Sequence, residues 1–389
     1  MQPAKWFLII FLLYFIGFFT HALYLKKTVY GDGIFYYSWV RSIVVDHNID
    51  FRNEYEHFGV NQIQTSTGLV GNKHSIGPAL LWLAPFWWTH QIVRGNGYEL
   101  PYQLATGATS LLLVLFGLVI LYGSLHKWFE QLTSLLTTLA IAGATNLLFY
   151  GSIDTVNSHG VSFFVSTLFL AFLLSRQASW AGLALGFLGA IRHQDLILGI
   201  IALGLLQKKE WVRFFAGSFI GFLPQLIAWQ FLYGSFWGIP YFTGEGFNLL
   251  HPHLLEILFS TKYGLFVYSP VIVLSFIGLF FWKHRLRWPC FLALLLELLL
   301  IASWSTWWQG ASYGIRMFVG SLPMAAVGIA ALFGIVTGGV LYMFSDSLTD
   351  TKHAKDWIWN SIGGIVLAAF SYLLLYTISP DLVQGFDIQ

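Results

Sequence analysis

The sequence predicts an all-α polytopic membrane protein with about 11 transmembrane helices and a long extracytoplasmic first loop that carries juxtamembrane helices. Apolar runs of about 20 residues recur along the chain, and a helix of that length spans the hydrocarbon core of a bilayer. Hydrophobic residues make up 57% of the chain and charged residues only 10%, whereas soluble domains carry about 25% charged residues. The only cysteine, Cys290, lies in an apolar run, which excludes an internal disulfide and a cysteine-based zinc cluster.

The first apolar run, 6–25, is too long for a signal peptide and is followed by no small-x-small cleavage motif, so we predict a retained helix. The run 76–93 contains two prolines and three tryptophans, which favours a helix lying at the membrane surface. The remaining spans are expected at about 102–123, 133–150, 160–175, 180–191, 196–206, 214–233, 265–282, 288–304, 317–343 and 357–378.

The distribution of lysine and arginine predicts the orientation of these spans. With Lys5 in the cytoplasm and 76–93 at the outer surface, the inner segments and Lys5 hold 11 of the 20 Lys and Arg residues, as the positive-inside rule requires. A full span at 76–93 would place the basic clusters at 207–213 and 283–287 outside. The polar clusters therefore gather on the extracytoplasmic face, in the segments 26–101, 151–159, 192–195, 234–264 and 305–316.

The first loop contains the residue that we expect at the chemical centre of a site, Asp32. It stands between two glycines within seven residues of the predicted membrane boundary. Glycine tolerates unusual backbone angles and adds no side chain, so a carboxylate in a Gly-Asp-Gly turn can approach a substrate closely. A second carboxylate, Asp154, lies in a turn rich in polar residues between two spans; a solvated turn is the alternative interpretation of that segment.

Cationic residues on the same face are typical of a site for phosphate. Arg192 lies between two runs that are each too short to cross a bilayer, and a charge at such depth indicates function unless it is paired. An Arg192–Asp195 pair that holds the turn is the alternative. The phosphate-binding candidates are Lys73, Arg192, Lys262 and Arg316, and the candidates for other substrate contacts are Tyr36, His74, His159, His193, Tyr263 and Tyr313. Glu297, inside an apolar run, is expected to be a helix-packing partner.

Several other kinds of site find no support. The chain has no Gly-x-x-x-x-Gly-Lys phosphate loop, no nucleotide-binding Gly-x-Gly-x-x-Gly after a strand and no His-Glu-x-x-His metal motif. A net charge of +2 gives no indication of nucleic-acid binding. Asp32 and Asp154 could together hold a divalent cation through oxygen ligands, while no cofactor is required by the pattern.

Four segments resemble the GT-C glycosyltransferases, integral-membrane enzymes that use polyprenyl-phosphate sugars, and in particular bacterial relatives of the protein mannosyltransferases and of the lipid A aminoarabinose transferase. GDGIFYYSWVRSIVVDHNIDFRNEY is similar to their first-loop motif, and KHSIGPALLWL to the start of their interfacial helix. SIDTVNSHG resembles the acidic motif of their second loop, and WWQGASYGIRMFVGSLP a Trp-Gly-x-Ser-x-Gly-x-Arg segment near the end of the core. The resemblance covers roughly residues 1–330.

This resemblance implies that Asp32 is the catalytic acid/base, that Asp154 is a second acid in the site, and that Lys73, Arg192, Lys262 and Arg316 meet the donor phosphate. The expected reaction is an inverting transfer of a mannose-like hexose from a polyprenyl phosphate to an acceptor hydroxyl of a lipid, glycan or protein. The expected location is a bacterial inner membrane, with the N-terminus in the cytoplasm. The chain departs from the family in lacking a large C-terminal extracytoplasmic domain.

Residues 1–333 are expected to form the catalytic core. Residues 334–389 resemble the two-helix core of a TrbC/VirB2-like pilin subunit, and they could equally be the last helices of the core. Three other functions stay open at this point: a lipid-linked oligosaccharide flippase or transporter, an O-antigen ligase or polymerase, and a non-catalytic assembly protein. A transporter predicts charged residues along a path through the membrane and two symmetric halves with broken helices.

Overall fold

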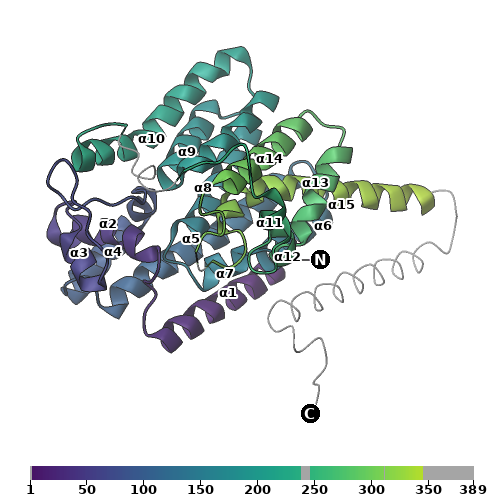
Figure 1. Ribbon diagram of the computed structural model, residues 1–389. Helices are drawn as coiled ribbons and strands as arrows, with labels where there is room; N and C mark the ends of the chain where they lie inside the picture. Colours follow the sequence, from purple (N-terminus) through teal and green to yellow (C-terminus); the bar gives the residue numbers. More distant parts are fainter. Residues whose placement is uncertain (1, 238–245, 311, 345–389) are drawn as a thin grey trace, which may run out of the picture.

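The computed structural model describes residues 2–237, 246–310 and 312–344, and within them the chain is built from helices with only isolated β-bridges. The all-α class is therefore confirmed. In these described ranges, four helices are long and apolar enough to cross a membrane: α1 (Pro3–Leu25), α5 (Leu100–His126), α10 (Trp211–Tyr233, which follows the 3₁₀ turn η3 at Lys208–Glu210) and α15 (Leu322–Phe344, preceded by the 3₁₀ helix η5 at Arg316–Ser321). They lie beside several shorter apolar helices in one bundle (Figure 1).

The shorter elements of the bundle are α6 (Gln131–Gly143), α7 (Leu147–Ser152), α8 (Ser158–Leu174), α9 (Ala178–Ile191), the 3₁₀ helix η2 (His193–Gly204), α11 (Leu254–Phe259), α12 (Leu265–Tyr268), α13 (Val271–Phe281) and α14 (Arg287–Ser303). Some of these helices pack with their backbones in direct contact, with no side chain between them. A Cβ atom on Gly186 of α9 would lie 1.9 Å from the carbonyl oxygen of Ser218 on α10. Small residues at such contacts let helix backbones pack closely, as is common among membrane helices.

Three predicted spans differ from the observed helices. The run 133–150 is divided, because α6 ends at Gly143 and the Asn146 N–H donates to the Ser269 hydroxyl across the bundle (3.0 Å) instead of continuing the helix. The run 265–282 breaks at Ser269, which precedes Pro270; a residue before proline avoids the helical conformation. The run 196–206 forms a 3₁₀ helix. The span expected at 357–378 lies outside the described residues.

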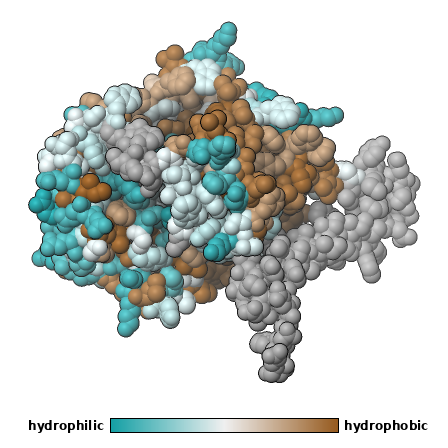
Figure 2. Space-filling view, viewed as in Figure 1, coloured by the Kyte–Doolittle hydropathy of each residue, from teal (hydrophilic) through white to brown (hydrophobic). Residues whose placement is uncertain are grey.

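The first loop folds into a compact layer of helices at one end of the bundle. It contains α2 (Gly33–Arg41), the short π-helix η1 (Ser42–Asp46), α3 (Arg52–Phe58) and α4 (Gly77–Val93). The buried Arg41 guanidinium pairs with Glu54, 2.9 Å away and fully buried, and with Asp46. Hydrophilic side chains gather over α2 and α3, whereas hydrophobic side chains cover α13 and α14 (Figure 2).

The interfacial helix predicted at 76–93 corresponds to α4. One side of α4 packs on α2, α5 and α9, while Trp88 and Ile92 on the other side are 62% and 80% exposed. A position at the membrane surface stays a prediction. The boundary expected at residue 334 falls inside α15, and residues 345–389, which include most of the pilin-like segment, lie outside the described residues.

Candidate functional site

The Gly-Asp-Gly turn lies where the first loop meets the loop between α7 and α8. Gly31 has φ +53°, a conformation that favours glycine, and Asp32 immediately precedes α2. A Cβ atom on Gly33 would lie 2.3 Å from the carbonyl oxygen of Val156. The two glycines therefore make the turn and its close contact with the second loop, and together they fix the position of the Asp32 side chain.

The Asp32 carboxylate forms an ion pair with Arg316, which begins η5 far along the chain. Arg316 Nη2 lies 2.7 Å from Asp32 Oδ2, and the two side chains are 19% and 40% exposed. The pair is thus open to water and to a bound molecule. It joins the first and the last of the segments in which we predicted site residues.

Further cations surround Asp32. Burial acts to raise the pKa of its carboxyl, but positive charges outweigh burial and hold this pKa below its usual value. The charges belong to Arg316, His74, Lys73 and Arg192. Burial lowers the pKa of His74 itself to about 4, so at neutral pH the imidazole is uncharged and the other three cations keep Asp32 ionised.

Asp154 has a different electrostatic environment, although Asp32 and Arg316 both act on it. Burial raises the pKa of the Asp154 carboxyl to about 6, and the negative charge of Asp32 adds to this rise. Asn157, the N-cap of α8, donates a hydrogen bond to the Asp154 carbonyl oxygen. Two carboxyl groups with pKa values moved in opposite directions thus share one end of the bundle, an arrangement that is common in active sites.

The turn between α9 and η2 brings Arg192 to the same region. Its Nη1 donates to the Ser158 hydroxyl (3.1 Å) and contacts His159 Nδ1 (3.0 Å), both at the start of α8. Its Nη2 donates to Gln194 Oε1 (3.0 Å), while Nε lies 4.0 Å from the fully buried Asp195 carboxylate. The expected Arg192–Asp195 pair exists, but the guanidinium also binds the start of α8 and Gln194.

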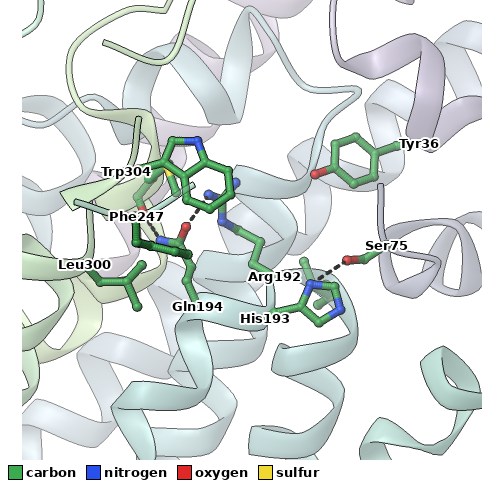
Figure 3. Close-up of a pocket in the computed structure, with 10 residues that line it drawn as sticks. Tyr36, Ser75, Arg192, His193, Gln194, Phe247, Leu300 and Trp304 are labelled. Atoms are coloured by element: carbon green, nitrogen blue, oxygen red, sulfur yellow. Dashed lines mark hydrogen bonds between the residues drawn. The ribbon is translucent and has the colours of Figure 1, made fainter. Parts of the chain in front are cut away.

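A cavity of about 310 Å³ opens beside this turn (Figure 3). One part of its wall is polar and the other is apolar. The polar residues are Tyr36, Ser75, Arg192, His193 and Gln194, and the apolar residues are Ile191, Phe247, Leu300, Trp304 and Met317. A cavity of this size and mixed character can take a small polar group together with an apolar chain.

The structure brings many of the predicted site residues together. His74 stacks on Phe35 with ring centroids 4.6 Å apart and meets Tyr36 edge to face at 4.9 Å. His193 stacks on Trp229 at the cavity, 3.5 Å from the Ser75 hydroxyl.

Two predicted residues lie at the edge of this group. Tyr313, just before η5, stacks on Phe149, and its N–H bonds the Tyr150 hydroxyl at 2.9 Å. Lys262 is exposed on the segment before α12, next to Tyr263, and is not among the charges that act on Asp32. Their participation in the site stays a prediction.

Sequence reasoning missed part of this site. Glu297 of α14 is fully buried and accepts a hydrogen bond from Gln194, so it is connected to the Arg192 turn rather than only packing helices. The aromatic wall formed by Phe247 and Trp304 was also missed. No short-range pattern in the sequence connects these residues, because the contacts join segments far apart in the chain, 103 residues for Gln194 and Glu297.

A divalent cation between Asp32 and Asp154 also stays a prediction. Among the described residues, no group of three or more His, Cys, Asp and Glu side chains could hold a metal ion. Asp32 is instead neutralised by Arg316.

Comparison with known proteins agrees with the polytopic membrane fold. No protein-family model matches the chain, and no curated protein matches its sequence. Among solved structures, the chain is similar to ArnT from Cupriavidus metallidurans in its apo state, with a TM-score of 0.55 and 12% sequence identity. The similarity covers 97% of this chain and 69% of ArnT. At this identity the similarity shows a common fold with ArnT.

Proposed function

We propose that this protein is a membrane glycosyltransferase that moves a hexose, mannose-like in its chemistry, from a polyprenyl-phosphate donor to an acceptor hydroxyl on the extracytoplasmic face. One observation carries the proposal: Asp32 pairs with Arg316 and lies in the field of Lys73 and Arg192, and Arg192 itself lines a cavity with one polar and one apolar wall. The cations suit a phosphate, and the apolar wall suits a lipid chain. The fold shared with ArnT supports a reaction of the GT-C class.

In the proposed reaction, Asp32 accepts the proton of the acceptor hydroxyl as its oxygen attacks the anomeric carbon. The bond between that carbon and the phosphate oxygen breaks, and the phosphate leaves with the electron pair. Attack from the face opposite the leaving group inverts the anomeric configuration. A positioned general base contributes about 10²–10⁴-fold to such a rate.

Cations stabilise the departing lipid phosphate, where negative charge develops in the transition state. Arg192, Arg316 and Lys73 are the candidates nearest Asp32. The phosphate carries its charge as it leaves, so the reaction needs no second acid to protonate it. Asp154 then acts as a neighbour that tunes the charge around Asp32.

Arg316 has two tasks in this mechanism. Its ion pair keeps Asp32 ionised before the donor binds, and a base must be ionised to accept a proton. The same pair makes Asp32 a weaker base, because a neighbouring cation stabilises the carboxylate. A phosphate that attracts Arg316 would weaken the pair and restore the basicity of Asp32, so donor binding and activation of the base are coupled.

A flippase or transporter accounts less well for these observations. Such a protein needs polar residues along a path through the membrane. The ion pairs found among the described residues instead gather around the first loop, the 192–195 turn and the segments that contact them. We further propose a bacterial inner-membrane location, and the positive-inside rule predicts that the N-terminus lies in the cytoplasm.

The decisive experiment supplies purified protein in detergent with polyprenyl-phosphate mannose and, separately, polyprenyl-phosphate aminoarabinose, each with a pooled lipid and peptide acceptor extract. The proposal expects release of polyprenyl phosphate and a glycosylated product of inverted anomeric configuration from the mannose donor. Transfer from the aminoarabinose donor alone would contradict the choice of sugar. Transbilayer movement of the donor in liposomes, without transfer from either donor, would favour the transporter.

A further inference from the structure

Glu297 lies in the apolar interior of α14 and is connected to the cavity by a single side chain. Its Oε1 accepts a hydrogen bond from Gln194 Nε2, and Gln194 Oε1 accepts one from Arg192 Nη2 at 3.0 Å. We propose that Glu297 is a positioning residue that holds the guanidinium of Arg192 at the cavity through Gln194. The identity of the group that Arg192 then binds, a lipid-linked phosphate, rests on the function proposed above.

The hydrogen bonds that connect Arg192, Gln194 and Glu297 are compatible with one orientation of the Gln194 side-chain amide. A guanidinium can only donate, so the atom of Gln194 that faces Arg192 must be the amide oxygen. The amide nitrogen then faces two acceptors, the Glu297 carboxylate and the Met317 carbonyl oxygen at 3.1 Å. An acceptor oxygen at position 297 thus selects the orientation of Gln194 that holds Arg192.

The two edges of the guanidinium are held by different parts of the protein. Nη1 contacts Ser158 and His159 at the start of α8, and Nη2 contacts Gln194. Within the part of the chain that the structure describes, Arg192 Nε has no hydrogen-bond partner. Nε lies 4.0 Å from the Asp195 carboxylate, an ion pair without a hydrogen bond. Loss of the Gln194 contact would therefore leave the guanidinium hydrogen-bonded only through Nη1 and less firmly oriented at the cavity.

A buried carboxyl group at position 297 destabilises the helix bundle, so its presence there indicates a function. A carboxyl group in a membrane helix is costly, and such groups usually mark function. Glu297 is fully buried, and its Oε2 accepts no hydrogen bond from the described residues. A residue that only packed helices would not need a polar group there, since an apolar side chain of similar volume packs as well.

The test compares Glu297→Leu, which removes the acceptor, with Glu297→Gln, which keeps the volume and one acceptor oxygen. Gln194→Met removes the connecting side chain without changing α14. Glu130→Leu, an exposed acid just before α6 and outside the site, is the matched control. One measurement is the rate at which phenylglyoxal modifies Arg192, followed by mass spectrometry. The other is the dissociation constant of undecaprenyl phosphate, followed by tryptophan fluorescence.

Glu297→Leu and Gln194→Met are each expected to speed the modification of Arg192 about fivefold or more and to weaken lipid-phosphate binding about tenfold. Glu297→Gln and Glu130→Leu should stay within about twofold of the wild type. In an Arg192→Met background, Glu297→Leu should weaken binding no further, because residues that act through one group are not additive.

An Arg192 reactivity that is the same in folded Glu297→Leu and Gln194→Met as in the wild type would overturn the inference. Additive losses with Arg192→Met would do so as well, since they indicate a role in packing alone. If the wild type binds no undecaprenyl phosphate while both variants still expose Arg192, the positioning role stands and the proposed function fails.

Discussion

The two ends of the helical bundle both carry basic residues, but they use them differently. We call the first loop, the turns 153–158 and 192–195 and the loops 246–264 and 305–316 the site end. The segments 126–130, 175–177, 205–210 and 282–288 form the basic end. They lie together: Lys127 bonds the Ser175 hydroxyl at 2.9 Å, and the rings of Trp128 and His284 are 4.9 Å apart.

Cations at the basic end meet neutral groups. Arg176 donates to the carbonyl oxygen of Leu205 at the end of η2, and Arg287 lies 4.4 Å from the ring of Trp288. All ion pairs identified in the described ranges lie at the site end. A cation that completes a helix end stabilises the fold. A cation held beside an exposed carboxylate remains available to a ligand. The environment of the charge, and not the number of charges, separates the two ends.

The largest expected difference between the two ends is in the rate of sugar transfer after an acidic residue is neutralised. Asp32→Asn should reduce sugar transfer at least 100-fold, because an amide cannot accept the acceptor proton. Glu130→Gln at the basic end should leave the rate within about twofold. Initial rates of transfer by the two purified variants check this, and equal rates would place the chemistry away from Asp32.

Arg316→Met should have the next largest effect, a loss of about 10–100-fold in transfer, because it removes both a phosphate ligand and the partner of Asp32. The pKa of Asp32 should rise without this cation, which moves the acidic limb of the pH–rate profile upward. Rates measured between pH 4 and 8 test the shift. A lower rate with an unchanged acidic limb would indicate that Arg316 acts on the donor phosphate and not on Asp32.

Asp154→Asn removes an ionisable group from the site end while keeping the shape of the side chain. Burial raises the pKa of Asp154 to about 6, so the folded protein binds this proton more tightly than the unfolded chain does. The stabilising contribution of Asp154 is complete below about pH 4 and is lost as the pH rises through about 6. Relative to the variant, the wild type should lose about 2 kcal/mol of stability between pH 4 and pH 7.5. Thermal unfolding at several pH values measures this.

Arg176→Met should affect only stability. The hydrogen bond from Arg176 to Leu205 connects the end of α8 to the end of η2, and its loss should cost about 1 kcal/mol. The midpoint of thermal unfolding should fall by a few degrees while transfer per folded molecule stays the same. A matching loss of transfer would mean that the two ends are coupled.

The smallest effect is expected for Lys262→Met. Lys262 is exposed and is absent from the charges that act on Asp32, whereas Lys73 is among them. Donor KM should change less than about twofold for Lys262→Met and about three- to tenfold for Lys73→Met, because a cation near the phosphate contributes more than a distant exposed one. The reverse order would place the phosphate near α12.

The sequence predicted those parts of the molecule that depend on local pattern. Apolar runs identify membrane helices, and Gly31 and Gly33 flank Asp32 because the turn requires them. It did not predict that Arg316 would be the cation beside Asp32 and that Lys262 would not, because both precede a span on the same face. Only the packing of distant helices distinguishes them.

The dependence on distant packing also explains why the sequence did not predict the helix breaks or the role of Glu297. Asn146 bonds Ser269 at the break between α6 and α7, and Gln194 bonds Glu297; each partner lies more than 100 residues away. A local run of apolar residues contains no information about such partners. The break at Ser269–Pro270 is the exception, since a proline is visible in the sequence.

The two ends of the first loop are fastened to each other by Gln103. The N–H groups of Thr28 and Val29 both donate to its side-chain oxygen, at 3.0 and 3.2 Å, and the Thr28 hydroxyl donates to its carbonyl oxygen. All groups of this closure are present in the chain once the start of α5 has been synthesised, whereas Arg316 is added near the end of the described chain. The Asp32–Arg316 pair therefore forms only when the first loop has packed against the start of η5, so the complete site requires the two distant parts of the bundle to come together.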